Sequence, residues 1–240
     1  APTPVVLAVH GGAWMSGDKW TMRNHSYQLA KRGIAAVSIN YRLAPKNKYP
    51  KQLDDVRDAL VWIVEHAKEY RFDPDRIGLY GYSAGGHLVS SIATLQDEPW
   101  ESVNVTTEWR RDDPRWSKLP NIVGALAGAP PTDFEGYPEE NTAMVYFLGG
   151  TRKERPEVYR AASPYTQISK SDPPIHIVHG DADLLVPIKM SRRFIARSKE
   201  RESETALTVV PRQGHFLTFI NPKLAETLLD FFDEHLFGGD

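Results

Sequence analysis

Residues 79–86 read Leu79-Tyr80-Gly81-Tyr82-Ser83-Ala84-Gly85-Gly86. A short apolar run, one serine and a group of small residues in this order are typical of a buried strand that turns sharply into a helix, with the serine at the turn. Such a turn needs small residues two positions before and after the serine, because larger side chains would collide with the strand or the helix. Gly81 and Gly85 occupy these positions. The stretch predicts a nucleophilic Ser83 with the Ala84 amide directed at the reacting carbonyl; a plain glycine-rich turn is the alternative.

The composition is that of an ordinary globular chain. Its 240 residues are 41% hydrophobic and 25% charged, which suits one domain or at most two. A net charge of −2 gives no reason to expect a nucleic-acid partner. No apolar run approaches the roughly 20 residues that a membrane span requires, so no membrane partner is expected. The absence of cysteine excludes disulfides and cysteine ligands, while the cellular compartment and the oligomeric state stay open.

Short apolar runs alternate with stretches of helical periodicity along the whole chain. Strands are predicted at 5–9, 34–39, 77–80, 122–127, 175–179 and 206–210. Helices are predicted at about 20–31, 53–67, 84–95, 188–199 and 224–236. Asp73-Pro74-Asp75 is expected to form a turn before the strand that leads to Ser83. This alternation predicts a mainly parallel sheet of about six strands with helices on both faces.

Two connections are too long for ordinary loops. Residues 96–120 carry Trp100, Trp109 and Trp116 among many charges, which is too aromatic for a disordered linker. We interpret this segment as a lid or substrate loop over a pocket, with the alternative that the tryptophans only pin the loop to the surface. Residues 130–164 form the second excursion and are given the same interpretation.

The residues that could take part in catalysis follow predicted strands. His10-Gly11-Gly12-Ala13-Trp14, Ser83, Asp183 and His215 each come after one. Because the carboxyl ends of parallel strands meet at the same edge of a sheet, all four should converge there. Their chain order of serine, acid and histidine is the order of the α/β-hydrolase arrangement. The glycine pair can turn backbone amides outward as an oxyanion hole requires, although a tight turn alone would also explain it.

Two rival assignments remain for the acid and the base. His87 lies one helical turn past Ser83, and a base on that helix would have to curl back across the turn, so a structural role is favoured. Asp181 lies directly after a turn glycine and has less loop with which to reach His215 than Asp183 has. Asp183 is therefore favoured as the acid.

The motifs together resemble those of the α/β-hydrolase esterases, most closely the small carboxylesterases of the hormone-sensitive-lipase and feruloyl/acetylxylan-esterase-like groups. The matching stretches are His10–Trp14, Tyr41-Arg42-Leu43-Ala44-Pro45, residues 81–86, His179-Gly180-Asp181-Ala182-Asp183 and Gly214-His215-Phe216. The resemblance implies one catalytic domain over 1–240, with Ser83 as nucleophile, His215 as base and Asp183 as the orienting acid. It also implies the amides of Gly12, Ala13 and Ala84 as oxyanion donors.

The sequence departs from that family pattern in two places. Ala13 stands where the family has a third glycine, which is harmless if the residue contributes only its N–H. The strand pair that precedes the first strand in the family is missing from this sequence. Either the sequence is a shortened form of a longer chain, or the sheet is reduced and residues 34–39 form a bare apolar edge, which is open to pairing.

The motifs and the resemblance indicate a serine ester hydrolase. No metal or cofactor is expected, because the sequence has no cysteine and no pair of histidines at i, i+4 spacing with an acid between them. Short-chain or aromatic acyl esters are the expected substrates, including acetyl or feruloyl esters of plant polysaccharides. Trp14, Leu184 and Phe216 directly follow the oxyanion turn, the acid and the base, and they are predicted to contact the substrate. An amide hydrolase such as an arylformamidase or an oligopeptidase-type peptidase remains the alternative. A catalytically inactive binding protein is a third possibility, against which the complete triad argues.

Overall fold

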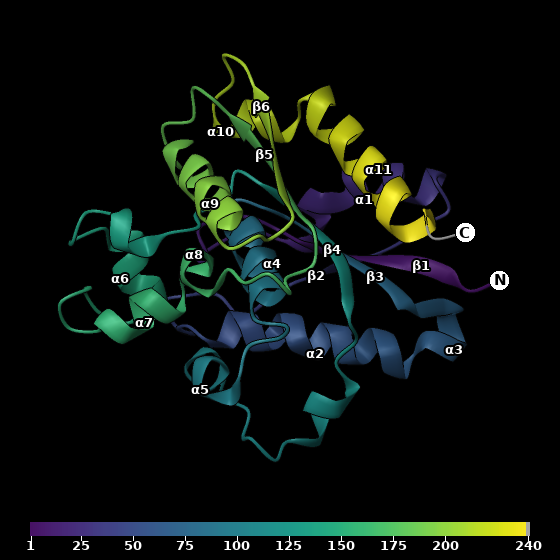
Figure 1. Ribbon diagram of the computed structural model, residues 1–240, viewed down its shortest axis with the longest axis horizontal. Helices are drawn as coiled ribbons and strands as arrows, with labels where there is room; N and C mark the ends of the chain where they lie inside the picture. Colours follow the sequence, from purple (N-terminus) through teal and green to yellow (C-terminus); the bar gives the residue numbers. More distant parts are fainter. Residues whose placement is uncertain (239–240) are drawn as a thin grey trace.

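A computed structural model describes residues 1–238 and shows one six-stranded sheet, all of whose pairings are parallel (Figure 1). The strand order is β2-β1-β3-β4-β5-β6. The strands are β1 (Thr3–Val9), β2 (Ala35–Ile39), β3 (Phe72–Tyr82), β4 (Ile122–Gly128), β5 (Ile175–Gly180) and β6 (Thr205–Val210). The predicted fold class is confirmed. Strand β1, which lies between β2 and β3, has no solvent exposure from Val5 to Val9, as expected for a parallel sheet covered on both faces.

Helices form one layer on each face of the sheet. On one face, α1 (Arg23–Lys31) and α11 (Pro222–Phe237) enclose an apolar cluster that includes Leu29 and Phe232. On the other face, α2 (Lys51–Glu65), α4 (Ala84–Thr94) and α9 (Lys189–Glu200) contribute to the larger cluster. Figure 1 shows α11 and α2 on opposite sides of the strands. The shorter helices are η1 (Lys19–Met22), α3 (Ala67–Tyr70), α5 (Trp100–Val103), η2 (Asn104–Thr106), η3 (Pro114–Lys118), η4 (Phe134–Gly136), α6 (Thr142–Leu148), α7 (Pro156–Ala161), α8 (Pro164–Gln167) and α10 (His215–Phe219).

The start of β3 differs from the prediction. Asp73-Pro74-Asp75 lies within the strand and not in a separate turn. Thr3 is paired with Phe72 but Val5 with Ile77, so the residues between bulge out of the ladder. A proline is tolerated in a bulge because its missing N–H breaks no ladder hydrogen bond there. The residues nevertheless keep a local turn contact, in which the Asp75 N–H donates to the Asp73 side chain at 3.1 Å.

The edge of the sheet lies where the sequence predicted it. β2 is the outermost strand beside β1, and all five of its residues are half-buried. Part of this edge is covered by the segment that leads into α1. The Ser38 hydroxyl donates to the Lys19 carbonyl at 2.9 Å, and the Lys19 N–H donates to the Asn40 side chain at 2.7 Å.

The two long connections lie at opposite ends of the strands. Residues 96–120 lead from the end of α4 to the start of β4, so they lie at the amino ends of the strands. Residues 130–164 follow the carboxyl end of β4, which is the edge where Ser83 lies. No helix among residues 1–238 is both long and apolar enough to cross a membrane.

Helix α11 packs directly on the backbone of β3. A Cβ atom added to Gly78 would lie 2.3 Å from Cε1 of Phe232, whose side chain has no solvent exposure. We expect Gly78→Ala to lower the free energy of unfolding by about 1–3 kcal/mol, because overpacking displaces a ring that has no space to move into. Urea unfolding measures this loss.

A matched control exists in η4. A Cβ atom on Gly136 would meet no atom closer than 3.6 Å, so Gly136→Ala should change stability by less than about 0.5 kcal/mol. Phe232→Leu combined with Gly78→Ala should recover part of the loss. Equal effects of the two alanine variants would contradict this packing.

Candidate active site

A cavity of about 610 Å³ opens at the carboxyl edge of the sheet. Its walls come from the loops after β1, β3, β4 and β5 and from α10. Ser83, Ala84 and His215 all face it, together with Gly12 and Ala13. The structure therefore brings together the residues that the sequence placed at the ends of separate strands.

The backbone holds Ser83 in a rare conformation. Its φ of 54° and ψ of −118° lie outside the regions that residues with a side chain favour. The Ser83 N–H donates to the Gly128 carbonyl at 2.7 Å, which fixes the turn against β4. Ser83 precedes α4 in the capping position, yet its hydroxyl makes no capping hydrogen bond. The hydroxyl is therefore free to face the cavity.

Backbone contact explains the two glycines of this turn. A Cβ atom on Gly81 would lie 2.2 Å from the Gly85 carbonyl oxygen, and one on Gly85 would lie 2.0 Å from the Val9 carbonyl oxygen. These distances leave no space for any side chain. β1, β3 and α4 thus meet at bare backbone directly below Ser83.

The loop after β1 turns its amides into the cavity. Gly12, Ala13 and Trp14 have consecutive positive φ values of 120°, 51° and 60°. The Gly12 carbonyl accepts the N–H groups of Met15 and Ser16, both at 3.0 Å. Among residues 1–238, the N–H groups of Gly12 and Ala13 donate to no protein acceptor. Both are free to bind an oxygen of a ligand next to Ser83.

His215 is paired with Asp183. Nδ1 of His215 lies 2.6 Å from Oδ2 of Asp183, and both side chains are buried. Oδ1 of Asp183 accepts the N–H groups of Leu185 and Val186, both at 2.9 Å. Asp181 instead accepts the Arg212 N–H at 2.5 Å and is exposed. Asp183, not Asp181, is therefore the carboxylate that orients this histidine.

The pKa of Asp183 lies well below its usual value. Burial alone would raise it, but hydrogen bonds from His179 and His215 and from the Val186 N–H outweigh burial. The carboxylate is therefore ionised at neutral pH and accepts the proton on Nδ1 of His215. Nε2 of His215 is left as the nitrogen that can take up a proton.

His179 is a second histidine on the same carboxylate, and the sequence reasoning gave it no role. Its Nε2 lies 2.8 Å from the Val186 carbonyl and 3.3 Å from Oδ2 of Asp183, and its Nδ1 lies 2.7 Å from the Ser191 hydroxyl. A carbonyl can only accept, so Nε2 carries the proton and Nδ1 accepts. The one available signal was its place at the start of the His179–Asp183 motif.

Tyr82 holds the backbone of His215 in place. Its hydroxyl donates to the His215 carbonyl at 2.5 Å, and the two rings lie 5.3 Å apart. Burial, followed by the charge of Asp183, raises the pKa of Tyr82, so the hydroxyl stays protonated and continues to donate. Tyr82 directly precedes Ser83, but its sequence position did not indicate this contact.

His87 faces away from the chemistry. It is fully buried, with Nδ1 accepting from Nε1 of Trp14 at 3.1 Å and Nε2 donating to the Ala162 carbonyl at 2.7 Å. Trp14 in turn stacks on Phe147 with ring centroids 4.2 Å apart. His87 therefore anchors the loop after β1 through Trp14.

Of the three residues predicted to contact substrate, two line the cavity. Trp14 and Phe216 do so, whereas Leu184 is 93% exposed and outside it. Leu185 and Val186 line the wall instead, because the loop turns at Asp183 and directs the next side chain to solvent.

Of the two long connections, only the 130–164 segment contributes to this cavity. Tyr137, Asn141, Ala143 and Met144 of the 130–164 segment line the cavity. No residue of the 96–120 segment lines this cavity. The physical reason is its direction, since a helix-to-strand connection returns to the amino ends of the strands.

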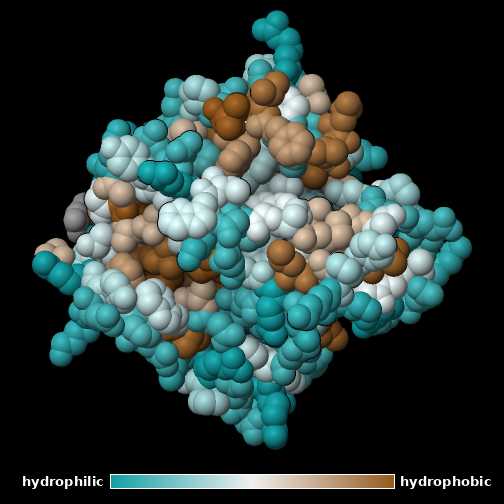
Figure 2. Space-filling model, turned by 180° about the vertical axis from the view of Figure 1, so that it is seen from behind, coloured by the Kyte–Doolittle hydropathy of each residue, from teal (hydrophilic) through white to brown (hydrophobic). Residues whose placement is uncertain are grey.

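Exposed apolar side chains surround the histidine. Leu184, Leu185, Phe216, Leu217 and Ile220 are between 56% and 93% exposed. Figure 2 shows hydrophobic side chains gathered on the part of this face where α10 lies. The short helix α10, which begins at His215, thus presents a largely apolar outer surface to solvent.

Metal ligands do not gather at this site. Within the part of the chain that the structure describes, no three histidine or acidic side chains form a group that could hold a metal ion.

A parallel sheet with a serine at a strained strand-to-helix turn, followed in chain order by a paired acid and histidine, defines an α/β-hydrolase. Residues 1–197 match the family model BD-FAE. The chain belongs to this family of α/β-hydrolase esterases.

Individual relatives of this chain are also named as esterases. The chain is 29% identical over 224 residues to "Esterase LipC" and 32% identical over 207 residues to "Probable carboxylic ester hydrolase LipM", both of Mycobacterium tuberculosis. These matches cover 89% and 82% of this chain but 53% and 45% of the relatives, so the chain spans about half their length.

Solved structures are also similar over nearly the whole chain. A "Truncated form of carbohydrate esterase from gut microbiota" has a TM-score of 0.83 at 26% identity, covering 98% of this chain and 86% of that chain. A thermophilic esterase of Thermogutta terrifontis with propionate bound has a TM-score of 0.78 at 25% identity, covering 97% and 84%.

The buried His87 makes stability depend on pH. Burial lowers its pKa from 6.5 to about 4, so between these values the unfolded chain binds a proton that the folded chain does not. The resulting stability is present above pH 6.5 and is lost as the pH falls toward 4, by roughly 3 kcal/mol in total. We expect His87→Gln to flatten the dependence of the urea midpoint on pH across this window.

His66→Gln serves as the control, because His66 stacks on Trp62 at the surface. It should leave the slope of the wild-type protein unchanged. If His87→Gln and the wild-type protein lost stability in parallel between pH 6.5 and 4, a neutral buried His87 would be contradicted.

Proposed function

We propose that this chain is a serine carboxylic ester hydrolase that works through an acyl-enzyme. One observation carries the proposal: an ionised, buried Asp183 holds His215 at 2.6 Å at the cavity where the strained turn presents Ser83. The family and the esterase names of the relatives support the same reaction class.

The first step is attack by Ser83 on the ester carbonyl. A serine hydroxyl is a weak nucleophile at neutral pH, so Nε2 of His215 takes its proton as the Oγ–C bond forms. Asp183 keeps the proton of the neutral ring on Nδ1 and stabilises the imidazolium that results. The carboxylate itself stays ionised throughout.

The developing oxyanion needs donors that are in place before the reaction. The N–H groups of Gly12 and Ala13 have no protein acceptor in the described chain, and the Ala84 N–H lies at the positive end of α4. Preorganised donors of this kind stabilise the transition state more than mobile water does. We assign these three amides to the oxyanion hole.

Collapse of the tetrahedral intermediate releases the alcohol, which receives the proton from His215. Water then attacks the acyl-serine in the same way, with His215 again as base, and the acid product leaves. His179 and Tyr82 act as positioning residues, since His179 donates toward Asp183 and Tyr82 holds the backbone of His215. Every step uses side chains and amides of this chain.

The walls of the cavity suit a compact acyl group. Tyr137, Met144, Val186 and Phe216 surround the space beside Ser83. A long flexible chain would need an extended apolar channel with an apolar cover, and the 96–120 segment lies at the other edge of the sheet. Acetyl-to-butyryl or aromatic acyl esters are therefore the proposed substrates, with acetyl or feruloyl esters of plant polysaccharides as the natural class. The carbohydrate esterase among the similar structures supports this class.

The test is a hydrolysis panel with nitrophenyl acetate, butyrate and octanoate, methyl ferulate, acetylated xylan and N-formylkynurenine. We expect kcat/KM to be highest for acetate-to-butyrate or ferulate esters. The Ser83→Ala variant should lose turnover but unfold at the same denaturant concentration as the wild-type protein. Each methylene that fits an apolar pocket gains about 0.8 kcal/mol, so a steady rise to octanoate would refute the short-acyl proposal. Preference for N-formylkynurenine would favour the amide hydrolase.

The choice of acid is tested by two asparagine variants. Asp183→Asn should lower kcat by roughly 10⁴-fold, the size of the loss when a triad acid no longer sets the histidine tautomer. Asp181→Asn should stay within about threefold of the wild-type protein, because Asp181 contacts only the Arg212 backbone of the neighbouring turn. Comparable losses of kcat in both variants would contradict the assignment of Asp183 as the acid.

A further inference from the structure

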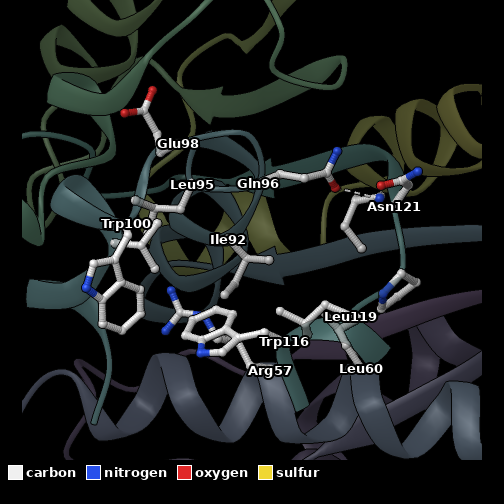
Figure 3. Close-up of a pocket in the computed structure, with 13 residues that line it drawn as sticks. Arg57, Leu60, Ile92, Leu95, Gln96, Glu98, Trp100, Trp116, Leu119 and Asn121 are labelled. Carbon is white, nitrogen blue, oxygen red and sulfur yellow. Dashed lines mark hydrogen bonds between the residues drawn. The ribbon is translucent and has the colours of Figure 1, made fainter. Parts of the chain in front are cut away.

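A second cavity lies at the amino edge of the sheet and has a volume of about 300 Å³. It is enclosed by α2, the end of α4 and residues 96–122 (Figure 3). Ile122, at the start of β4, lines it, while Gly128 at the end of β4 holds the turn of Ser83. At about 3.3 Å per residue, β4 separates the two sites by roughly 20 Å. The cavity is therefore no part of the proposed catalytic pocket.

Two indole rings form the aromatic part of its wall. The rings of Trp100 and Trp116 lie 5.9 Å apart and nearly perpendicular, at 87°. Trp116 is fixed by its Nε1, which donates to the Arg110 carbonyl at 2.9 Å. Figure 3 shows both rings near Arg57, with Ile92 above them. Both tryptophans are only half-buried, so ring surface remains accessible to a ligand.

Arg57 supplies hydrogen-bond donors that the protein does not use. Its side chain is 4% exposed. Nη1 donates to Oδ1 of Asp54 at 3.0 Å and to the Thr106 carbonyl at 2.7 Å, and Nη2 donates to the Thr106 hydroxyl at 2.9 Å. A guanidinium has five N–H groups. Among residues 1–238, two of the five, one on Nε and one on Nη2, therefore have no protein acceptor at a cavity wall.

The charges of the cavity favour a neutral ligand. Asp54 is 2% exposed and balances the charge of Arg57. Glu98 adds a negative charge to the lining, and Gln96 and Asn121 add amides. Oε1 of Gln96 accepts the Ile122 N–H at 2.6 Å, which leaves its NH₂ group as a donor. An anion would gain no net attraction here, whereas a neutral molecule with many hydroxyl groups finds both donors and acceptors.

We propose that this cavity is a binding site for a neutral sugar unit of an oligosaccharide. A pyranose ring presents apolar C–H faces to aromatic rings and hydroxyl groups around its edge, which is the combination that Trp100, Trp116, Arg57 and the amides accommodate. The site would hold a polysaccharide chain while Ser83 acts on an ester of the same polymer. This second statement rests on the proposed function, whereas sugar binding itself does not.

Binding is tested on the whole chain with xylotriose, cellotriose and mannotriose as neutral probes and trigalacturonate as the charged one, by isothermal titration calorimetry. We expect saturable binding of at least one neutral probe and a loss of at least tenfold in affinity for Trp100→Ala. Trp62→Ala removes a surface tryptophan of α2 outside the cavity and should change nothing. Asn121→Ala, at an exposed position, gives a second weakening variant if Trp100→Ala unfolds.

Hydrolysis separates this proposal from the proposed function. Trp100→Ala should leave kcat/KM for nitrophenyl acetate unchanged and raise KM for acetylated xylan at least threefold. An enzyme that bound xylotriose but cleaved no ester would refute the function and leave the sugar site standing. The sugar site would be refuted if no neutral probe bound, if trigalacturonate bound more tightly than the neutral probes, or if Trp100→Ala bound the probes as well as the wild-type protein does.

Discussion

The backbone contact below Ser83 is the constraint on which the rest of the structure depends. Gly85 lies against the Val9 carbonyl and Gly81 against Gly85, so the first helix after the turn starts within backbone distance of two strands. This contact fixes the direction of α4 and forces Ser83 into its rare conformation. The loop after β1 begins at the same point, so the amides and the serine are placed relative to one another by a single junction.

The carboxylate of Asp183 plays the corresponding role on the other side of the cavity. Two backbone N–H groups and two histidines converge on it, so it is held from four directions. His179 is itself fixed by Ser191 and by the Val186 carbonyl. The orientation of His215 therefore depends on β5 and α9 as much as on its own loop, and the site is assembled from rigid elements of both halves of the chain.

The sequence predicted the fold and the convergence of Ser83 and Asp183 with His215, because strand ends and chain order are visible in apolar runs. The contacts of His179 and Tyr82 were not predictable, since they depend on side-chain partners that no spacing encodes. Which leucine of residues 184–185 faces the cavity depends on how one loop turns. The placement of residues 96–120 could have been predicted, because a segment between a helix and the next strand returns to the amino ends of the strands.

Helix α10 carries His215 on five residues whose outer surface is largely apolar and exposed. Little packing holds this helix from outside, so its place depends on the inward contacts of Phe219 with Tyr82 and His25 and on the hydrogen bonds that Asp183 and Tyr82 make to His215. Segments with few buried contacts open at a smaller free-energy cost than the whole domain unfolds. Heat or denaturant should consequently inactivate this protein by releasing one short segment, at conditions where the six-stranded sheet is still intact.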